Sequence, residues 1–157
     1  MTVKLIYIGK TGKSFLVEGE KEYTKRLKRY LKFETIELPD IKNSKKMSFQ
    51  EVKSKEGIQI LSKINDDERV FLLDEKGKDF DSVSFSKFIQ KQFNIGGQGI
   101  VFVVGGPYGF SEEVYKRATG KIALSKLTFS HQMIRMFFVE QLYRAMTIIK
   151  GEPYHHQ

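Results

Sequence analysis

The sequence of 157 residues contains no cysteine. The protein therefore cannot form a disulfide bond, attack a substrate through a thiolate or bind zinc through sulfur, and this absence fits a reducing compartment. Long hydrophobic runs are also missing. The apolar stretch within residues 1–9 is too short for a membrane span and lacks the layout of a signal peptide. We expect a cytoplasmic protein with no membrane partner.

Several motifs of nucleotide and metal chemistry are absent as well. The sequence has neither Gly-x4-Gly-Lys-Ser/Thr nor Gly-x-Gly-x-x-Gly, and the Gly9–Lys13 loop is too compact to replace them. No trio of His, Asp and Glu has the spacing of metal ligands, so we expect no catalytic metal. Ser130 directly precedes His131, which is poor geometry for a nucleophile and its base. Kinase-like, dinucleotide-binding and serine-hydrolase functions lose support.

Size and charge limit the number of domains and the kind of partner. One domain over residues 1–157 is expected, because no repeat or linker interrupts the chain and an apolar fraction of 40% is enough for a core. The 19 acidic residues are outnumbered by 27 Lys and Arg, so the net charge is +8. This charge favours a polyanionic partner, although a solvated basic surface explains it equally well.

Strand-like and helix-like segments alternate along the chain. This alternation predicts an α/β fold with a mainly parallel sheet and helices on both faces. A turn is expected at Lys76–Lys78, and Ser48 with Glu51 forms a capping-box pattern. The expected strands cover residues 3–9, 33–38, 69–74, 99–105 and 121–124; the expected helices cover residues 14–31, 48–64, 82–93, a short segment after Ser111, and 130–150.

Three loops follow the carboxyl ends of expected strands, after Leu73, Gly105 and Leu124. Parallel sheets bind ligands at this edge, so the three loops form one site if their strands are neighbours. Gly105 and Gly106 allow a ligand to approach the backbone closely, but an ordinary tight turn has the same residues. Residues 124–129 either wrap a ligand with their backbone or form a plain edge strand.

The last expected helix carries further polar candidates. His131 lies in its first turn, where the helix dipole favours the neutral imidazole; it is either a site residue or a helix-start residue. Arg135 has no acid four residues later and suits a phosphate or carboxylate, whereas Glu140 and Arg144 form a common surface pair. The tail Tyr154–His156 is either frayed or stacks on a nucleobase.

These segments together resemble the SPOUT-class methyltransferases that modify N3 of pseudouridine in large-subunit ribosomal RNA. The resemblance covers essentially the whole chain and is specific because its motifs occur in order. They are Ile8-Gly9-Lys10, Glu22-Tyr-x-Lys-Arg-Leu27, Leu73-Asp-x-x-Gly-Lys78, Gly105-Gly-Pro-x-Gly109, Leu124-Ser-x-Leu-Thr-Phe129, His131-x-x-x-Arg135, Glu140-Gln-x-Tyr-Arg-Ala145 and Pro153-Tyr-His155.

The resemblance implies a homodimer, a C-terminal trefoil knot and direct methyl transfer from S-adenosyl-L-methionine to RNA, on assembled ribosomes. It implies a backbone contact rather than a side-chain role for Lys126. The implied cofactor-binding residues are Leu73, Gly105, Gly106, Leu124, Ser125, Lys126, Leu127, Thr128 and Phe129. The implied substrate-handling and catalytic residues are His131, Arg135, Arg144, Tyr154 and His155.

The sequence allows more than one proton acceptor and more than one function. His155 and His131 are both candidates to accept the N3 proton, because they titrate near neutrality. The Lys-rich segments 21–32 and 42–46 are candidates to hold RNA. The alternatives are a non-catalytic RNA-binding or ribosome-associated assembly factor and a mononucleotide- or flavin-binding domain. The last helix carries extra apolar residues beyond one stripe, which predicts a dimer interface: Met133, Met136, Phe137 and Val139.

Overall fold

Five parallel strands form one sheet in the order β2-β1-β4-β3-β5 in the computed structural model, which describes residues 1–156. The most apolar strand, β4, is buried along its whole length near the middle of the sheet. Strands β4, β3 and β5 are neighbours, so their carboxyl ends meet at one edge. The strands are β1 (Thr2–Ile8), β2 (Lys32–Leu38), β3 (Arg69–Asp79), β4 (Gly99–Val104) and β5 (Gly120–Ala123).

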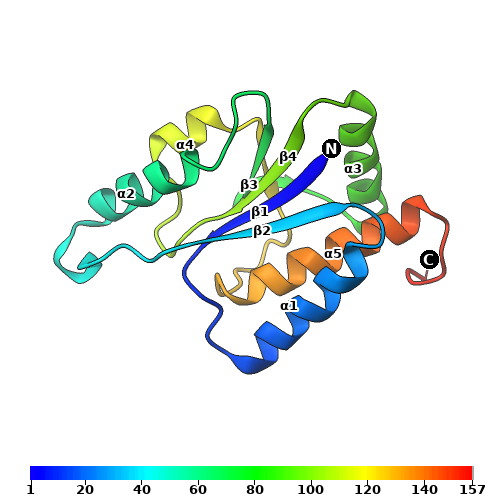
Figure 1. Cartoon of the computed structure of the whole chain (residues 1–157), viewed down its shortest axis with the longest axis horizontal. Coiled ribbons are helices and arrows are strands. Elements are labelled where there is room, and N and C mark those ends of the chain that lie inside the picture. The colour runs from blue at the N-terminus through cyan, green and yellow to red at the C-terminus, as the bar shows by residue number, and fades with distance from the viewer. Residues whose placement is uncertain (157) are drawn as a thin grey trace.

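Helices cover both faces of this sheet (Figure 1). One face carries α1 (Ser14–Leu27), α3 (Ser82–Ile95) and α5 (Met133–Ile149). The other face carries α2 (Phe49–Leu61), preceded by the short 3-10 turn η1 (Ser44–Lys46), and α4 (Glu112–Arg117). The predicted α/β fold with a parallel sheet and helices on both faces is therefore confirmed.

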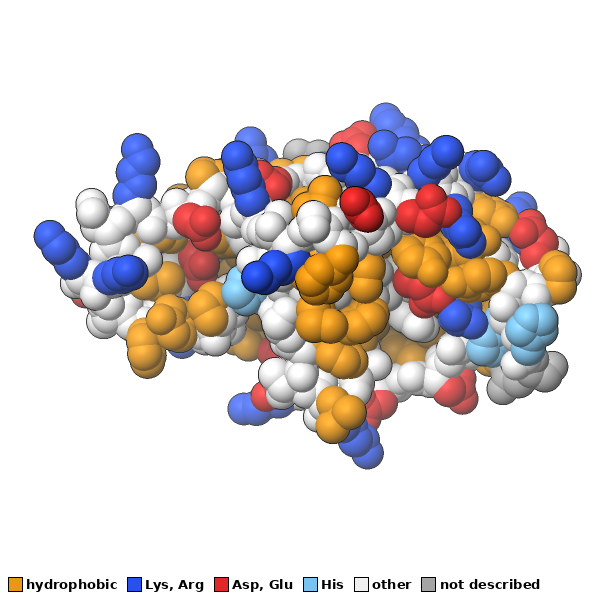
Figure 2. Space-filling view, turned by 90° about the horizontal axis from the view of Figure 1, so that it is seen from below, with side chains coloured by type: hydrophobic (Ala, Val, Ile, Leu, Met, Phe, Trp, Pro, Cys, Tyr) orange, Lys and Arg blue, Asp and Glu red, His pale blue; other side chains and the backbone are white. Residues whose placement is uncertain are grey.

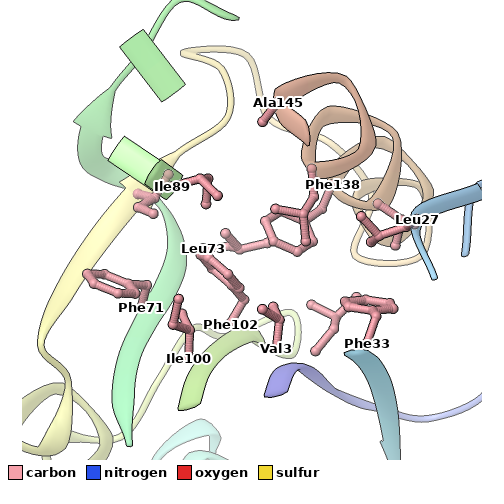
Figure 3. Close-up of a cluster of buried hydrophobic side chains, with 14 of the residues drawn as sticks. Val3, Leu27, Phe33, Phe71, Leu73, Ile89, Ile100, Phe102, Phe138 and Ala145 are labelled. Carbon is pink, nitrogen blue, oxygen red and sulfur yellow. The ribbon is translucent and has the colours of Figure 1, made fainter. Parts of the chain in front are cut away.

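The larger core lies between the sheet and helices α1, α3 and α5. Figure 3 shows Phe102 of β4 directed toward Phe138 of α5, with Leu27 of α1 and Ile89 of α3 on either side. The rings of Phe102 and Phe138 are 4.7 Å apart, and both side chains are fully buried. Burial of aromatic and aliphatic side chains of this size is the main stabilising term of the fold. It also holds α5 against the sheet.

Helix boundaries depend on caps that the sequence identified only in part. The Ser48 hydroxyl accepts a hydrogen bond from the Glu51 amide, as the capping-box pattern predicts. The α3 helix is capped by Asp81, whose side chain accepts a hydrogen bond from the Ser84 amide, one residue before the predicted helix start. A carboxylate one residue earlier competes successfully for the free amides of the first turn.

Strand β3 continues beyond the predicted strand end, so the turn expected at Lys76–Lys78 is wrong. Leu73 and Lys78 both pair with Ile122 of β5, and the register shifts between them. A Cβ at Gly77 would lie 2.5 Å from the Ile122 nitrogen, so this segment passes directly against the β5 backbone. Such close wrapping suits a threaded chain, and the trefoil knot itself stays a prediction.

Candidate functional site

Residues 73–76 within β3 and the loops that follow β4 and β5 line one cavity of about 570 Å³. It lies at the carboxyl edge of the three neighbouring strands, where α/β sheets bind ligands. The three segments predicted after Leu73, Gly105 and Leu124 therefore meet at one cavity, but the first of them belongs to β3 and is not a loop. Its lining includes Leu73, Gly105, Gly106, Leu124, Ser125, Leu127, Thr128 and Phe129 among the predicted cofactor residues, together with His131.

Two hydrogen bonds to β3 hold the cavity walls together. The Tyr115 hydroxyl of α4 donates to Asp74 at 2.7 Å, and the Thr128 hydroxyl donates to Glu75 at 2.8 Å. Burial and the bond to Asp74 raise the pKa of Tyr115 to about 12, so this hydroxyl keeps its proton at neutral pH. Helix α4 and the loop after β5 are thus both anchored to the middle of β3.

Residues 124–132 form an irregular loop, not the edge strand that alternation allowed. Strand β5 ends at Ala123, and helix α5 begins only at Met133, three residues later than predicted. The Leu127 amide is satisfied locally by the Ser125 hydroxyl at 2.9 Å. Leu127 is 75% exposed, which leaves its apolar side chain available to a ligand. Lys126 is exposed and does not line the cavity, so its predicted backbone contact remains a prediction.

The glycine turn after β4 is shaped by contacts on both sides. Gly109 has a φ of +84°, which favours glycine, and its amide donates to the Gly106 carbonyl. A Cβ at Gly105 would lie 3.0 Å from the Phe110 ring. The backbone of Gly105 and Gly106 therefore stays bare toward the cavity, where it can bind the polar edges of a ligand.

His131 lines the same cavity, just before α5. Partial burial lowers the pKa of His131, and the positive charge of Arg135 lowers it further, against a smaller opposing effect of Asp40. The imidazole is therefore neutral near pH 7, as the sequence predicted. The larger cause is burial rather than the helix dipole, since α5 begins two residues after His131.

Arg135 has no acid partner four residues later, but it has strong partners far away in the chain. It is only 1% exposed, and its guanidinium donates to the carbonyls of Ile8 and Gly9 at 2.7 and 2.9 Å. It also donates to the Thr11 hydroxyl and lies 4.1 Å from the centre of the Tyr7 ring. These contacts join α5 to the end of β1, and they favour a structural role for Arg135 over phosphate binding.

The other predicted substrate residues form a separate cluster at the far end of α5. Arg144 donates to Glu140 at 2.6 Å and lies 3.1 Å from Nδ1 of His155. The Tyr154 hydroxyl donates to the same Glu140 oxygen at 2.8 Å, and the pKa of Tyr154 is raised by burial and by hydrogen bonds with Tyr23 and Glu140. Glu140 thus joins three predicted residues, although sequence reasoning gave it only a surface pairing. Its helical spacing to Arg144 was the available signal.

This cluster does not reach the cavity within one chain. Arg144, Tyr154 and His155 are absent from the cavity lining, whereas Ile134 of α5 belongs to it. Ten residues of α-helix separate Ile134 from Arg144, which is about 15 Å along the axis. The predicted site residues therefore form two groups, one around the cavity and one around the tail.

Residues 1–156 show neither a membrane-spanning helix nor a metal-binding group. No helix in this range is long and apolar enough to cross a membrane. In the same range, no three His, Asp or Glu side chains are grouped so that they can hold a metal ion.

Comparison with known proteins identifies close relatives. The model of the family described as "Predicted SPOUT methyltransferase" matches residues 1–155. The proteins named "Ribosomal RNA large subunit methyltransferase H" from Christiangramia forsetii and Flavobacterium johnsoniae are 58% and 55% identical to this chain over 157 residues, and each alignment covers both chains completely. The protein of that name from Cytophaga hutchinsonii is 54% identical over 156 residues.

Proposed function

This chain belongs to the SPOUT methyltransferase family, and on that basis we propose that it methylates N3 of a pseudouridine in large-subunit ribosomal RNA, with S-adenosyl-L-methionine as methyl donor. The observation that carries the proposal is the cavity at the ends of β3, β4 and β5, lined by eight of the nine predicted cofactor residues. The assembled ribosome is the proposed form of the substrate.

The cavity residues suit this cofactor. A volume of about 570 Å³ lies within the range of small-molecule sites. Bare backbone at Gly105 and Gly106 offers hydrogen bonds to polar groups, and Leu124, Leu127 and Phe129 offer apolar contact to an adenine ring. S-adenosyl-L-methionine supplies a methyl group on an electrophilic sulfonium. The protein then has to hold the substrate nitrogen in line at about 3–3.5 Å, which is catalysis by positioning.

His155 is better suited to donate a hydrogen bond than to accept the N3 proton. An arginine side chain only donates, so its short contact with Arg144 makes Nδ1 of His155 the acceptor. The neutral imidazole then carries its proton on Nε2. From there it can donate to a carbonyl oxygen of the base, where negative charge develops as the N3 proton leaves.

His131 is the better candidate for the proton acceptor. It lines the cavity, and its lowered pKa keeps the imidazole neutral and able to accept a proton near pH 7. His131 lies at the cavity and His155 in the tail cluster. A substrate base therefore has to contact both histidines at once. The two histidines would then have different roles, one as acceptor and one as donor.

A basic and aromatic surface beside the cavity supports an RNA substrate. Tyr108 lines the cavity and stacks on Phe49 with ring centres 4.1 Å apart, and the two side chains are 42% and 64% exposed. Exposed aromatic rings bind unstacked bases, and the lysines of segment 42–46 precede Phe49. Figure 2 shows further Lys and Arg side chains projecting from one face of the molecule. Such contacts position RNA without reading its sequence.

A homodimer would complete the site, and we propose one. The tail cluster lies far from the cavity of its own chain, so a second copy has to bring its tail to that cavity. Next to the cavity, an apolar hollow of about 420 Å³ is lined by Phe129 and Phe137 with other apolar residues, and it offers a surface for the partner. The trefoil knot belongs to the same proposal, because it would hold residues 124–132 in place.

The test is transfer of labelled methyl from S-adenosyl-L-methionine to ribosomes from a strain that lacks this protein. Mass spectrometry of the nucleosides should place the label on N3 of a pseudouridine. If folded protein transfers no label to confirmed unmodified ribosomes, the non-catalytic assembly factor becomes the better interpretation. Binding of a flavin or mononucleotide in place of the methyl donor would instead favour the third alternative.

A further inference from the structure

Glu56 is a buried acid that none of the contacts described above uses. It lies in α2, and only 6% of its surface is exposed. Its Oε1 atom is buried and has no hydrogen-bond partner among the described residues, which also form no ion pair with it. A buried carboxylate without a partner is costly, so this one points to a charge that is supplied when a ligand binds.

The carboxylate lies directly behind the glycine turn of the cofactor cavity. A Cβ at Gly106 would lie 2.6 Å from Oε2 and 2.8 Å from Oε1 of Glu56, so both oxygens touch this residue on one side. Gly106 lines the cavity, whereas Glu56 does not. One residue of backbone therefore separates the carboxylate from the ligand space, and little water can screen its charge across that distance.

Within residues 1–156, a second acid acts on Glu56 and no basic side chain forms an ion pair with it. Burial raises the pKa of Glu56, and the negative charge of Asp40, after β2, raises it further. Gly106 and Pro107 in the facing turn carry no charge, and the nearby cap of α4 is Ser111. A cation in the cavity would oppose the effects of burial and of Asp40 on the pKa of Glu56, because an opposite charge stabilises the ionised form.

We propose that Glu56 is a positioning residue that makes the cavity favour the cationic methyl donor over its product. This inference rests on the proposed function. S-adenosyl-L-methionine carries a sulfonium charge, and S-adenosylhomocysteine, which remains after transfer, has a neutral sulfur. The ionised carboxylate attracts the donor across the Gly106 wall and loses this attraction once the methyl group has left. Product exchange after each reaction is then favoured.

The proposal has a consequence for pH. Because its pKa is raised, Glu56 in the free protein keeps its proton up to a higher pH than an exposed glutamate does. Donor binding favours the ionised form, so a proton is released on binding. Affinity for the donor should therefore rise with pH until the pH exceeds the pKa of Glu56 in the free protein. Affinity for the product should change much less over the same range.

Titration calorimetry of the whole protein tests this. Donor and product are titrated separately in two buffers of different ionisation enthalpy, which reports the protons released. We expect the wild type to release a proton when the donor binds. Glu56→Gln should release no proton, and its ratio of donor affinity to product affinity should fall about tenfold. Glu56→Asp should retain part of both. Glu18→Gln, an exposed acid of α1, is the matched control.

The outcomes separate the two proposals. If the wild type binds neither ligand, the proposed cofactor is wrong and this inference falls with it. If the wild type binds both but Glu56→Gln keeps proton release and preference, only the role of Glu56 is overturned. If the variant does not fold, the ratio of donor to product affinity in the wild type decides: a ratio that stays flat across mildly acidic pH contradicts the proposal.

Discussion

At the scale of single residues, Glu140 organises the C-terminal tail. Its carboxylate accepts hydrogen bonds from both Arg144 and Tyr154, and Arg144 in turn contacts His155. The Glu140 and Arg144 side chains are 15% and 24% exposed, so their interaction is less screened than that of a surface pair. Loss of the carboxylate should release three side chains at once.

Replacement of Glu140 by Gln should therefore reduce methyl transfer about hundredfold, because small displacements of positioning groups have effects of that size. The assay is the initial rate with saturating methyl donor. Glu22→Gln is the matched control, since Glu22 and Arg26 have the same helical spacing but are 53% and 40% exposed. Equal rates for the Glu140 variant and the wild type would contradict a role of Glu140 in organising the tail.

Residue identity alone could not assign the partners of Arg135 or Glu56. Arg135 was predicted to suit a phosphate or carboxylate because no acid stands four residues later, yet its carbonyl partners lie 126 and 127 residues away. Glu56 has no unusual neighbours in the sequence, and only the turn after β4 makes it notable. Local spacing identifies helix pairs such as Glu140 and Arg144, because those contacts are local.

At the scale of elements, the end of β3 wraps around β5. Pairing of Leu73 and Lys78 with the same residue, Ile122, requires the segment between them to pass against β5. Gly77 is the residue that makes this contact possible, since its α-carbon has no side chain. The sequence identified the Gly77 region as a turn because Lys-Gly-Lys is typical of turns, and the tertiary pairing overrode that preference.

Gly77→Ala should accordingly destabilise the fold by about 1–3 kcal/mol or more, the usual cost of overpacking against an unyielding backbone. The Cβ would lie 2.5 Å from the Ile122 nitrogen and 2.6 Å from the Lys121 carbonyl carbon. Denaturant unfolding measures the change. Gly120→Ala is the control, because its Cβ would meet only the Phe71 ring at 3.4 Å. A Gly77 variant as stable as this control would contradict the close packing.

At the scale of the whole molecule, the extra apolar residues of α5 pack in two different places. Val139 is buried in the core of its own chain, and Met136 packs against Gly19 of α1, so these two do not form an exposed interface as predicted. Phe137 is half-buried, contacts the Phe129 ring at 5.0 Å and borders the apolar hollow. The proposed partner surface therefore includes fewer residues of α5 than the sequence predicted.

Phe137→Glu should weaken dimerisation and methyl transfer together, since a charge in an apolar contact is costly and the tail of one chain is proposed to serve the other. Light scattering after size exclusion reports the oligomeric state beside the activity assay. Ile58→Glu, on the opposite face of the sheet and 70% exposed, should leave both unchanged. A monomeric Phe137 variant with full activity would rule out the shared site.

The sequence by itself determined the α/β class, the order of strands and helices and the three segments that form the cavity, because hydrophobic periodicity and turn residues act over short distances. The tertiary structure decided that β4, β3 and β5 are neighbours, that Arg135 joins α5 to β1, and that Glu56 lies behind Gly106. It also separated the tail cluster from the cavity. These relations depend on contacts between residues far apart in the chain, which no local pattern encodes.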